Sequence, residues 1–300
     1  METRSPRAAA QFSCLVLKPR EWPATLSDAL HCTIKDNGFI LAKAASYSSA
    51  LSLFPGLIFV TALLFRNNAY ETLTDLAEAI GYVLPPQVNR MLGEFLTVSS
   101  DRSTIVIAFA GAAAILFSSD AMGALMEGFR TAYRLPRRQS MWADYGLAVL
   151  LVFCSTVPLS AMNAALILSR QIQNRLTRVF GERWWIVESL EVRWWAIAVI
   201  TVTAVLSVIY YVAPNRRQRW RDVLPGAVLG AMLWAPMTAM FTFYVQYIAR
   251  YREFYGNIST VIVLLIWTYL ASVIVVFGCE VNAARERRLG TLPARRPDDH

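Results

Sequence analysis

The sequence predicts an all-α membrane protein, a bundle of six transmembrane helices with short amphipathic helices in its loops. Of its 300 residues, 56% are hydrophobic and only 17% are charged, which is too apolar for an ordinary soluble domain. The apolar residues also form long runs instead of alternating stripes, as expected of helices that cross a bilayer. The net charge of +8 fits basic loops at a membrane surface, so no nucleic-acid partner is predicted.

The segment that precedes the first apolar run has two parts. Residues 1–25 are basic and contain several prolines, and they are predicted to form a cytoplasmic N-terminal segment. Leu26, Ala29, Leu30 and Ile34 then recur at helical spacing. This pattern predicts a short amphipathic helix, which lies either on the membrane surface or against the loops.

Six apolar runs are each long enough to cross a bilayer. The predicted spans are residues 39–65, 104–126, 141–169, 194–212, 223–248 and 258–280. Polar loops separate them, and the loop at 66–103 is predicted to hold two short amphipathic helices, while 170–191 is predicted to be a further polar loop. The membrane domain thus covers residues 26–285, and residues 286–300 are predicted to be a disordered basic tail.

Several spans contain residues that bend a helix or let two helices approach closely. A proline removes one backbone hydrogen bond of the helix, and a glycine leaves room for a neighbouring backbone. The predicted kink and packing positions are Pro55, Pro158, Pro225, Gly226, Gly230 and Pro236.

The distribution of lysine and arginine predicts the orientation. An even number of spans places both termini on one side of the membrane. The N-terminal segment, the 130–138 loop, the 214–221 turn and the tail together hold about twice as many Lys and Arg residues as the opposite loops. Both termini are therefore predicted to be cytoplasmic.

Polar side chains from separate spans are predicted to gather near the cytoplasmic boundary. Asp120, Glu127 and Arg134 recur at seven-residue spacing, and Arg130 shares their helical face. The candidate site residues are Lys43, Asp120, Glu127, Arg130, Arg134, Glu280 and Asn282.

Two interpretations of these residues stay open. They form either a vestibule that accepts a charged headgroup or an ion, or a set of salt bridges that fastens the helices together. Glu280 is expected to lie close to Lys43 or Arg130, because an unpaired carboxylate between packed helices is unfavourable.

The sequence shows no catalytic constellation, and the protein is predicted not to be an enzyme. His31 and His300 stand near opposite ends of the chain, far from any carboxylate cluster. Neither a metal-dependent nuclease nor a Ser-His-Asp triad can be assembled from them. The four cysteines show no paired spacing, so no metal or cofactor is predicted.

A series of motifs resembles the YihY/BrkB family of six-span inner-membrane proteins, over about residues 25–285. The motifs are Ser-Leu-Phe-Pro at 52–55, Arg130 with Ala132-Tyr133, Pro225-Gly226, Tyr255-Gly256, and Gly278-x-Glu280-x-Asn282. Phe129 departs from the asparagine that many members have at this position. The resemblance implies a bacterial inner-membrane location, but the family has no settled activity, and some members have carried a ribonuclease or a virulence-factor label.

The predicted function is therefore that of a non-catalytic transport protein for a lipid or another amphiphile. The alternative is a structural or assembly factor that binds another membrane protein, and a ribonuclease is the least supported reading. Membrane lipids are the predicted partners. The choice between a membrane-protein partner and a homo-oligomer stays open.

Overall fold

The computed structural model describes residues 22–66, 104–136, 141–180, 184–216, 218–245 and 259–292. These residues form helices joined by turns, and no strand occurs among them, which confirms the all-helical fold class. The long helices are α2 (Trp22–Lys35), α3 (Gly38–Arg66), α6 (Thr104–Tyr133), α7 (Met141–Phe180), α8 (Trp184–Val212), α9 (Trp220–Phe243) and α11 (Ser259–Arg288).

Four segments are long and apolar enough to cross a membrane. They are Thr104–Tyr133, Met141–Met162, Trp220–Phe243 and Val261–Arg288. A shorter apolar segment, Ala196–Val212, belongs to α8. The chain is therefore a membrane protein with several apolar helices, and the six-span arrangement stays a prediction.

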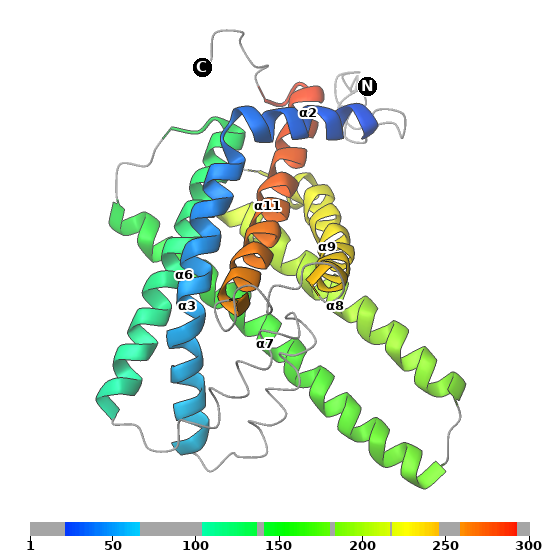
Figure 1. The fold of residues 1–300 in the computed structure, drawn as a ribbon. Helices are drawn as coiled ribbons and strands as arrows, with labels where there is room; N and C mark the ends of the chain where they lie inside the picture. Colours follow the sequence, from blue (N-terminus) through cyan, green and yellow to red (C-terminus); the bar gives the residue numbers. More distant parts are fainter. Residues whose placement is uncertain are drawn as a thin grey trace, which may run out of the picture.

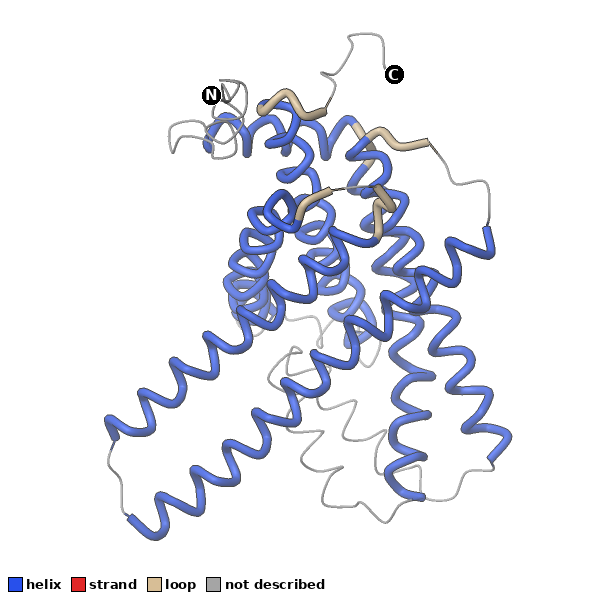
Figure 2. The backbone as a smooth tube through the Cα atoms, turned by 180° about the vertical axis from the view of Figure 1, so that it is seen from behind, coloured by secondary structure: helices blue, strands red, loops and turns tan. Residues whose placement is uncertain are grey.

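Helix α11 runs through the middle of the bundle and contacts α2, α3, α6 and α9 (Figure 1). Helices α3 and α6 lie side by side along most of their length. Helices α7 and α8 form a pair that slants away from the others, as the view from behind also shows (Figure 2). Helix α2 lies across one end of the bundle (Figure 1).

The largest buried cluster holds α6, α7, α8, α9 and α11 together. The rings of Phe129 and Tyr210 meet edge to face with their centroids 5.5 Å apart. The Tyr210 hydroxyl donates a hydrogen bond to the Val275 carbonyl at 2.7 Å, so this buried phenol is satisfied by α11. A second cluster joins α3, α9 and α11. The third packs Ala29 of α2 against Val281 and Ala284 of α11.

Helices α9 and α11 approach so closely that only glycine fits at their crossing. A Cβ atom built on Gly226 would lie 2.0 Å from the Gly278 carbonyl oxygen, and one on Gly278 would lie 2.5 Å from the Tyr210 hydroxyl. Gly230, one turn along α9, faces α8, and a Cβ atom built on it would lie only 3.0 Å from the Leu206 side chain. Small residues at such a crossing let the two backbones pack directly.

The predicted amphipathic helix is α2, and it uses only part of its apolar surface for packing. Ala29 and Thr25 are buried, and Leu26 packs with them against α11. Leu30 and Ile34 stay 50% and 58% exposed on the other side of the helix. One face of α2 therefore contacts the helix α11 instead of the loops, one apolar face remains uncovered, and a location of α2 on the membrane surface stays a prediction.

Helix ends differ from the sequence prediction in two places. Helix α7 continues to Phe180 and α8 begins at Trp184, so most of the predicted 170–191 loop is helical. Helix α11 continues to Arg288, so the tail predicted to be disordered from residue 286 is helical over its first three residues. Polar residues such as Arg, Gln and Glu have good helix propensity, and a span can continue as a helix beyond its apolar part.

The prolines lie inside continuous helices. Pro55 is within α3, Pro158 within α7, and Pro225 and Pro236 within α9. Several predictions fall outside the described residues: the N-terminal segment up to residue 21, the helices in 67–103, the end of the fifth span after residue 245, and the tail after residue 292.

Candidate functional site

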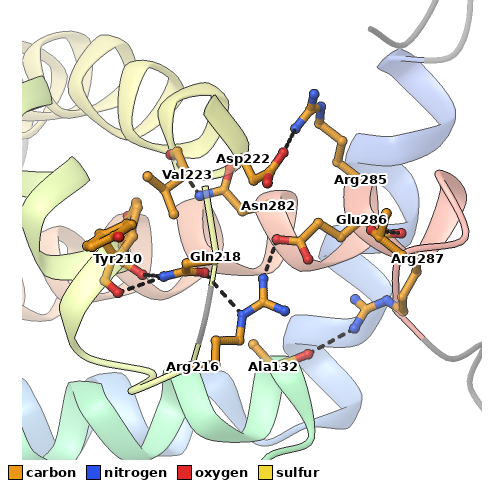
Figure 3. A network of polar contacts seen from close by, with 12 residues as sticks. Ala132, Tyr210, Arg216, Gln218, Asp222, Val223, Asn282, Arg285, Glu286 and Arg287 are labelled. Carbon is orange, nitrogen blue, oxygen red and sulfur yellow. Dashed lines mark hydrogen bonds and ion pairs between the residues drawn. The ribbon is translucent and has the colours of Figure 1, made fainter. Parts of the chain in front are cut away.

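Polar side chains gather where the last turns of α11 meet the ends of α6 and α8 and the start of α9. We call this group the polar cluster, and Figure 3 labels its members other than Glu280. Its members are Arg216, Gln218, Asp222, Glu280, Asn282, Arg285, Glu286 and Arg287. Most of them come from α11, and their partners come from earlier parts of the chain.

Arg216, in the turn between α8 and α9, is the most connected residue of the polar cluster. Its guanidinium pairs with the Glu286 carboxylate, donates to the Gln218 side-chain oxygen at 3.1 Å, and lies 3.9 Å from the centre of the Tyr133 ring. Gln218 in turn donates to the carbonyls of Tyr210 and Tyr211 at 2.6 and 2.8 Å, which satisfies the end of α8. The turn is thus tied to α6, α8 and α11 at once.

The charge of Arg216 does not change with pH. Burial alone lowers the pKa of the guanidinium, but the hydrogen bond to Glu286 and the nearby Tyr133 raise it more, so the pKa lies above its ordinary value. The side chain of Glu286 is only 7% exposed. This contact is therefore a permanent, nearly dry ion pair.

Glu280 is buried and has a cation beside it, but the cation is neither Lys43 nor Arg130. Arg287, two turns along α11, lies 3.3 Å from the Glu280 carboxylate and also donates to the Ala132 carbonyl at 2.9 Å. The predicted partner was wrong because α11 extends far enough to supply its own arginine. The same arginine satisfies a carbonyl in the last turn of α6.

Arg130 and Glu127 form a separate group on α6. The Arg130 guanidinium holds both oxygens of Asp144, at the start of α7, at 2.9 and 2.6 Å. Glu127 lies 3.8 Å from Arg130 and is more exposed. Arg134, four residues after Arg130, directly follows the last residue of α6 and has a left-handed backbone conformation with a φ of 53°. Its neighbour Leu135 donates its backbone N–H to the Arg130 carbonyl at 2.9 Å, which closes the helix end.

Asn282 binds α9 directly beside the glycine crossing. Its side-chain oxygen accepts from the Gly226 backbone N–H at 2.7 Å, and its side-chain nitrogen donates to the Val223 carbonyl at 2.9 Å. Further along α11, Arg285 lies 3.6 Å from Asp222 in the first turn of α9. The start of α9 is therefore held by polar contacts to one helix.

We expect Asn282→Ala to lower the free energy of unfolding by about 2 kcal/mol, because two hydrogen bonds of about 1 kcal/mol each are lost in a buried site. Thermal unfolding of the purified protein in detergent measures the change. Asn282→Asp keeps the acceptor and loses the donor, so it should also destabilise. Wild-type stability in the alanine variant would show that these two bonds do not hold α9.

Asp120 lies apart from the polar cluster, on the outward side of α6. It is exposed, and it accepts a hydrogen bond from Ser48 of the neighbouring α3. Ten residues separate it from Arg130, which is about 15 Å along the helix. Lys43 is also exposed, and it has no ion pair among the residues that the structure describes. The seven predicted residues therefore divide into several groups.

The position of Asp120 along α6 is unusual for an acid. Helix α6 has 30 residues and is about 45 Å long. Asp120 lies about 24 Å from one end and about 20 Å from the other. A hydrocarbon layer about 30 Å thick, placed anywhere along this helix, includes it. A layer that begins at Thr104 ends about 6 Å, or one helical turn, beyond Asp120, so the expectation that Asp120 lies near the membrane boundary stays a prediction.

Sequence analysis missed the residues that bind the turn and the end of α11. Arg216 lies in a turn that the sequence marks only as basic, and Glu286 and Arg287 lie in a segment predicted to be a tail, because hydropathy carries no signal for their partners. A further group that hydropathy does not reveal consists of Cys32, Asp36 and Glu280, whose possible metal-ligand atoms lie within 4.8 Å of one another. A thiol and two carboxylates can bind a divalent ion, but Arg287 already supplies positive charge to Glu280, so we assign no ion there.

Comparisons with known proteins agree with the membrane fold. A model of the family described as Virulence factor BrkB matches residues 30–300. YfkH of Bacillus subtilis (strain 168), which is named as ribonuclease-like, is 28% identical over 255 residues, covering 84% of this chain and 91% of the relative. A UPF0761 membrane protein of Idiomarina loihiensis is 24% identical over 257 residues, covering 84% and 87%. No solved structure matches the chain.

Proposed function

The chain belongs to the Virulence factor BrkB family of membrane proteins, and we propose that it is a non-catalytic transport protein for a lipid or another amphiphile. The proposal places it in a bacterial inner membrane with both termini in the cytoplasm, in keeping with the excess of Lys and Arg on that side. Helices α3 and α8 complete six spans with the four apolar segments described above.

Asp120 is the observation that carries this proposal. A carboxylate inside the hydrocarbon layer is expensive, and it is retained where it serves a function. Asp120 is exposed at the α3–α6 surface, so a lipid headgroup can reach it from the bilayer. Ser48 is buried, and its hydroxyl donates a hydrogen bond to Asp120.

The geometry suggests how a headgroup crosses the apolar layer. Headgroup hydroxyl or ammonium groups can donate hydrogen bonds to Asp120. These bonds replace the hydrogen bonds to water that the headgroup loses when it enters the apolar layer. Ser48 keeps the carboxylate oriented and satisfies it between passages. Lys43, also exposed and five residues before Ser48 on α3, offers an anion contact closer to the end of the helix. The polar cluster meanwhile holds one end of the bundle fixed.

Asp120→Asn should slow transport at least tenfold while the protein still folds, because the side-chain oxygen of asparagine can also accept the hydrogen bond from Ser48. A hydrogen bond to a charged group contributes about 1.5–3 kcal/mol, which corresponds to one to two orders of magnitude in rate or affinity. The protein is reconstituted into vesicles with fluorescent lipids, and transbilayer movement is followed by the accessibility of the fluorophore to a membrane-impermeant reductant.

Asp28→Asn is the matched control, because it removes one exposed carboxylate from α2, a helix other than the two that hold Asp120 and Ser48. It should transport at the wild-type rate. Wild-type protein that moves no lipid above the rate of protein-free vesicles, for anionic and zwitterionic lipids alike, would contradict the proposed function.

A structural or assembly role is the second candidate, and the exposed apolar face of α2 favours it. Leu30 and Ile34 are uncovered at the end of the bundle, where a partner protein could pack on them. A stoichiometric protein partner retained after mild solubilisation, together with no lipid movement, would favour this role.

We propose no ribonuclease activity, although one relative is named as ribonuclease-like. His31, the histidine that lies within the described residues, is on the exposed side of α2. RNA cleavage by the purified protein, lost on mutation of one carboxylate, would contradict this proposal.

A further inference from the structure

The arginines that the structure describes in the turn between α8 and α9 are of two kinds. Arg216 points into the protein and pairs with Glu286. Arg219 and Arg221 are exposed, and neither makes an ion pair with any residue that the structure describes. Asp222, the acid next to them, lies 3.6 Å from Arg285. Two guanidinium groups therefore remain uncompensated at the end of a helix that is apolar enough to cross a membrane.

Trp220 stands between these two arginines with a fixed orientation. Its ring stacks on Tyr211 at a centroid distance of 4.2 Å and an interplanar angle of 6°. About half of Trp220 nevertheless remains exposed. Tryptophan and tyrosine gather at the level of lipid headgroups, where one part of the ring is apolar and the other is polar. An exposed stack of this kind is typical of that level.

An exposed apolar path leads from Arg221 along α9. Leu224 and Met232 follow Arg221 by three and eleven residues, so all three lie on about the same helical face. Leu224 is 42% and Met232 is 61% exposed. Arg221 to Met232 covers about 16 Å along the helix, close to half of a hydrocarbon layer about 30 Å thick. This path matches the acyl chain of one lipid in one leaflet.

We propose that Arg219, Trp220, Arg221 and the Leu224–Met232 face bind a phospholipid with an anionic headgroup. The two guanidinium groups hold the phosphate and compensate its charge, the indole packs on the glycerol region, and an acyl chain lies along α9. The site does not depend on the proposed transport. It selects lipids by headgroup charge, because the local acids are already engaged by Arg285 and Arg216.

The test compares lipids that differ only in headgroup charge. Delipidated protein in detergent is titrated with phosphatidylglycerol or with phosphatidylcholine of the same chains, and bound lipid is counted by native mass spectrometry. We expect wild-type protein to bind phosphatidylglycerol at least fivefold more tightly. Each arginine near an anionic lipid should contribute about fivefold, so R219Q/R221Q should lose about 25-fold in phosphatidylglycerol affinity.

Two further variants and one soluble probe make the result specific. R219K/R221K keeps both charges and should retain most of the preference, whereas Lys35→Gln removes one exposed charge from α2 and should leave it unchanged. Glycerol phosphate carries the anion without the chains and should bind at least tenfold more weakly. Equal binding of the two lipids to wild-type protein, an R219Q/R221Q variant with unchanged preference, or glycerol phosphate as tight as the lipid would each overturn the proposal.

Discussion

Gly226→Ala is expected to lower the free energy of unfolding by about 3 kcal/mol or more, and to reduce sharply the yield of folded protein. The new methyl group would lie 2.0 Å from the Gly278 carbonyl oxygen and 2.6 Å from the Asn282 side-chain nitrogen. A side chain can rotate away from such a contact, but a backbone carbonyl inside α11 cannot. The whole of α9 would have to move, which would also break its hydrogen bonds to Asn282.

Gly123→Ala is the matched control for this prediction. Gly123 lies inside α6, and a Cβ atom built on it meets nothing within 4 Å. Alanine is the better helix former by about 1 kcal/mol, so this variant should be as stable as the wild type or more stable. The two variants are compared by thermal unfolding in the same detergent. Equal melting temperatures would refute the close crossing of α9 and α11.

Glu286→Gln is expected to destabilise the protein by about 3 kcal/mol. The substitution keeps the size of the side chain and removes the charge that compensates Arg216. Removing one partner of a buried ion pair costs about 3–5 kcal/mol, since the other charge stays in a largely buried site without its partner. We take the lower value because the side chain of Arg216 is 15% exposed. Denaturant or thermal unfolding measures the loss.

A second ion pair of α11 provides the control for this variant. Arg288 donates to Asp28 of α2 at 2.8 Å, but these side chains are 32% and 52% exposed. Exposed pairs contribute about 0–1 kcal/mol, so Asp28→Asn should change stability little. If the two variants were equally stable, the burial of the Arg216–Glu286 pair would have no energetic consequence, contrary to our interpretation.

The helices could be predicted from hydropathy because a span needs about twenty apolar residues, a signal that is local in the sequence. The polar contacts could not. Arg216, Arg219 and Arg221 look equivalent in a basic turn, and only the packing of α11 against α6 turns the first inward and leaves the others outside. Arg287 reaches Glu280 only because α11 continues into a segment whose composition resembles a solvated tail.

The position of Asp120 shows a second limit of sequence reasoning. The seven-residue spacing correctly puts it on one helix with Glu127, but it says nothing about which residue of α3 lies beside it. Its contact with Ser48 depends on the register between α3 and α6, which is fixed by pairs such as Phe59 beside Gly111. Such a register follows from the shapes of both surfaces and not from either sequence alone.

The place of α11 in the chain has a consequence for biogenesis. Each helix or turn that it binds, from α2 to the start of α9, precedes it in the sequence, and a ribosome therefore delivers all of them to the membrane first. Until Glu286 and Arg287 have been synthesised, Arg216 and the Ala132 carbonyl of α6 lack these partners. The bundle can thus close only after translation has passed residue 287, which makes its assembly largely post-insertional.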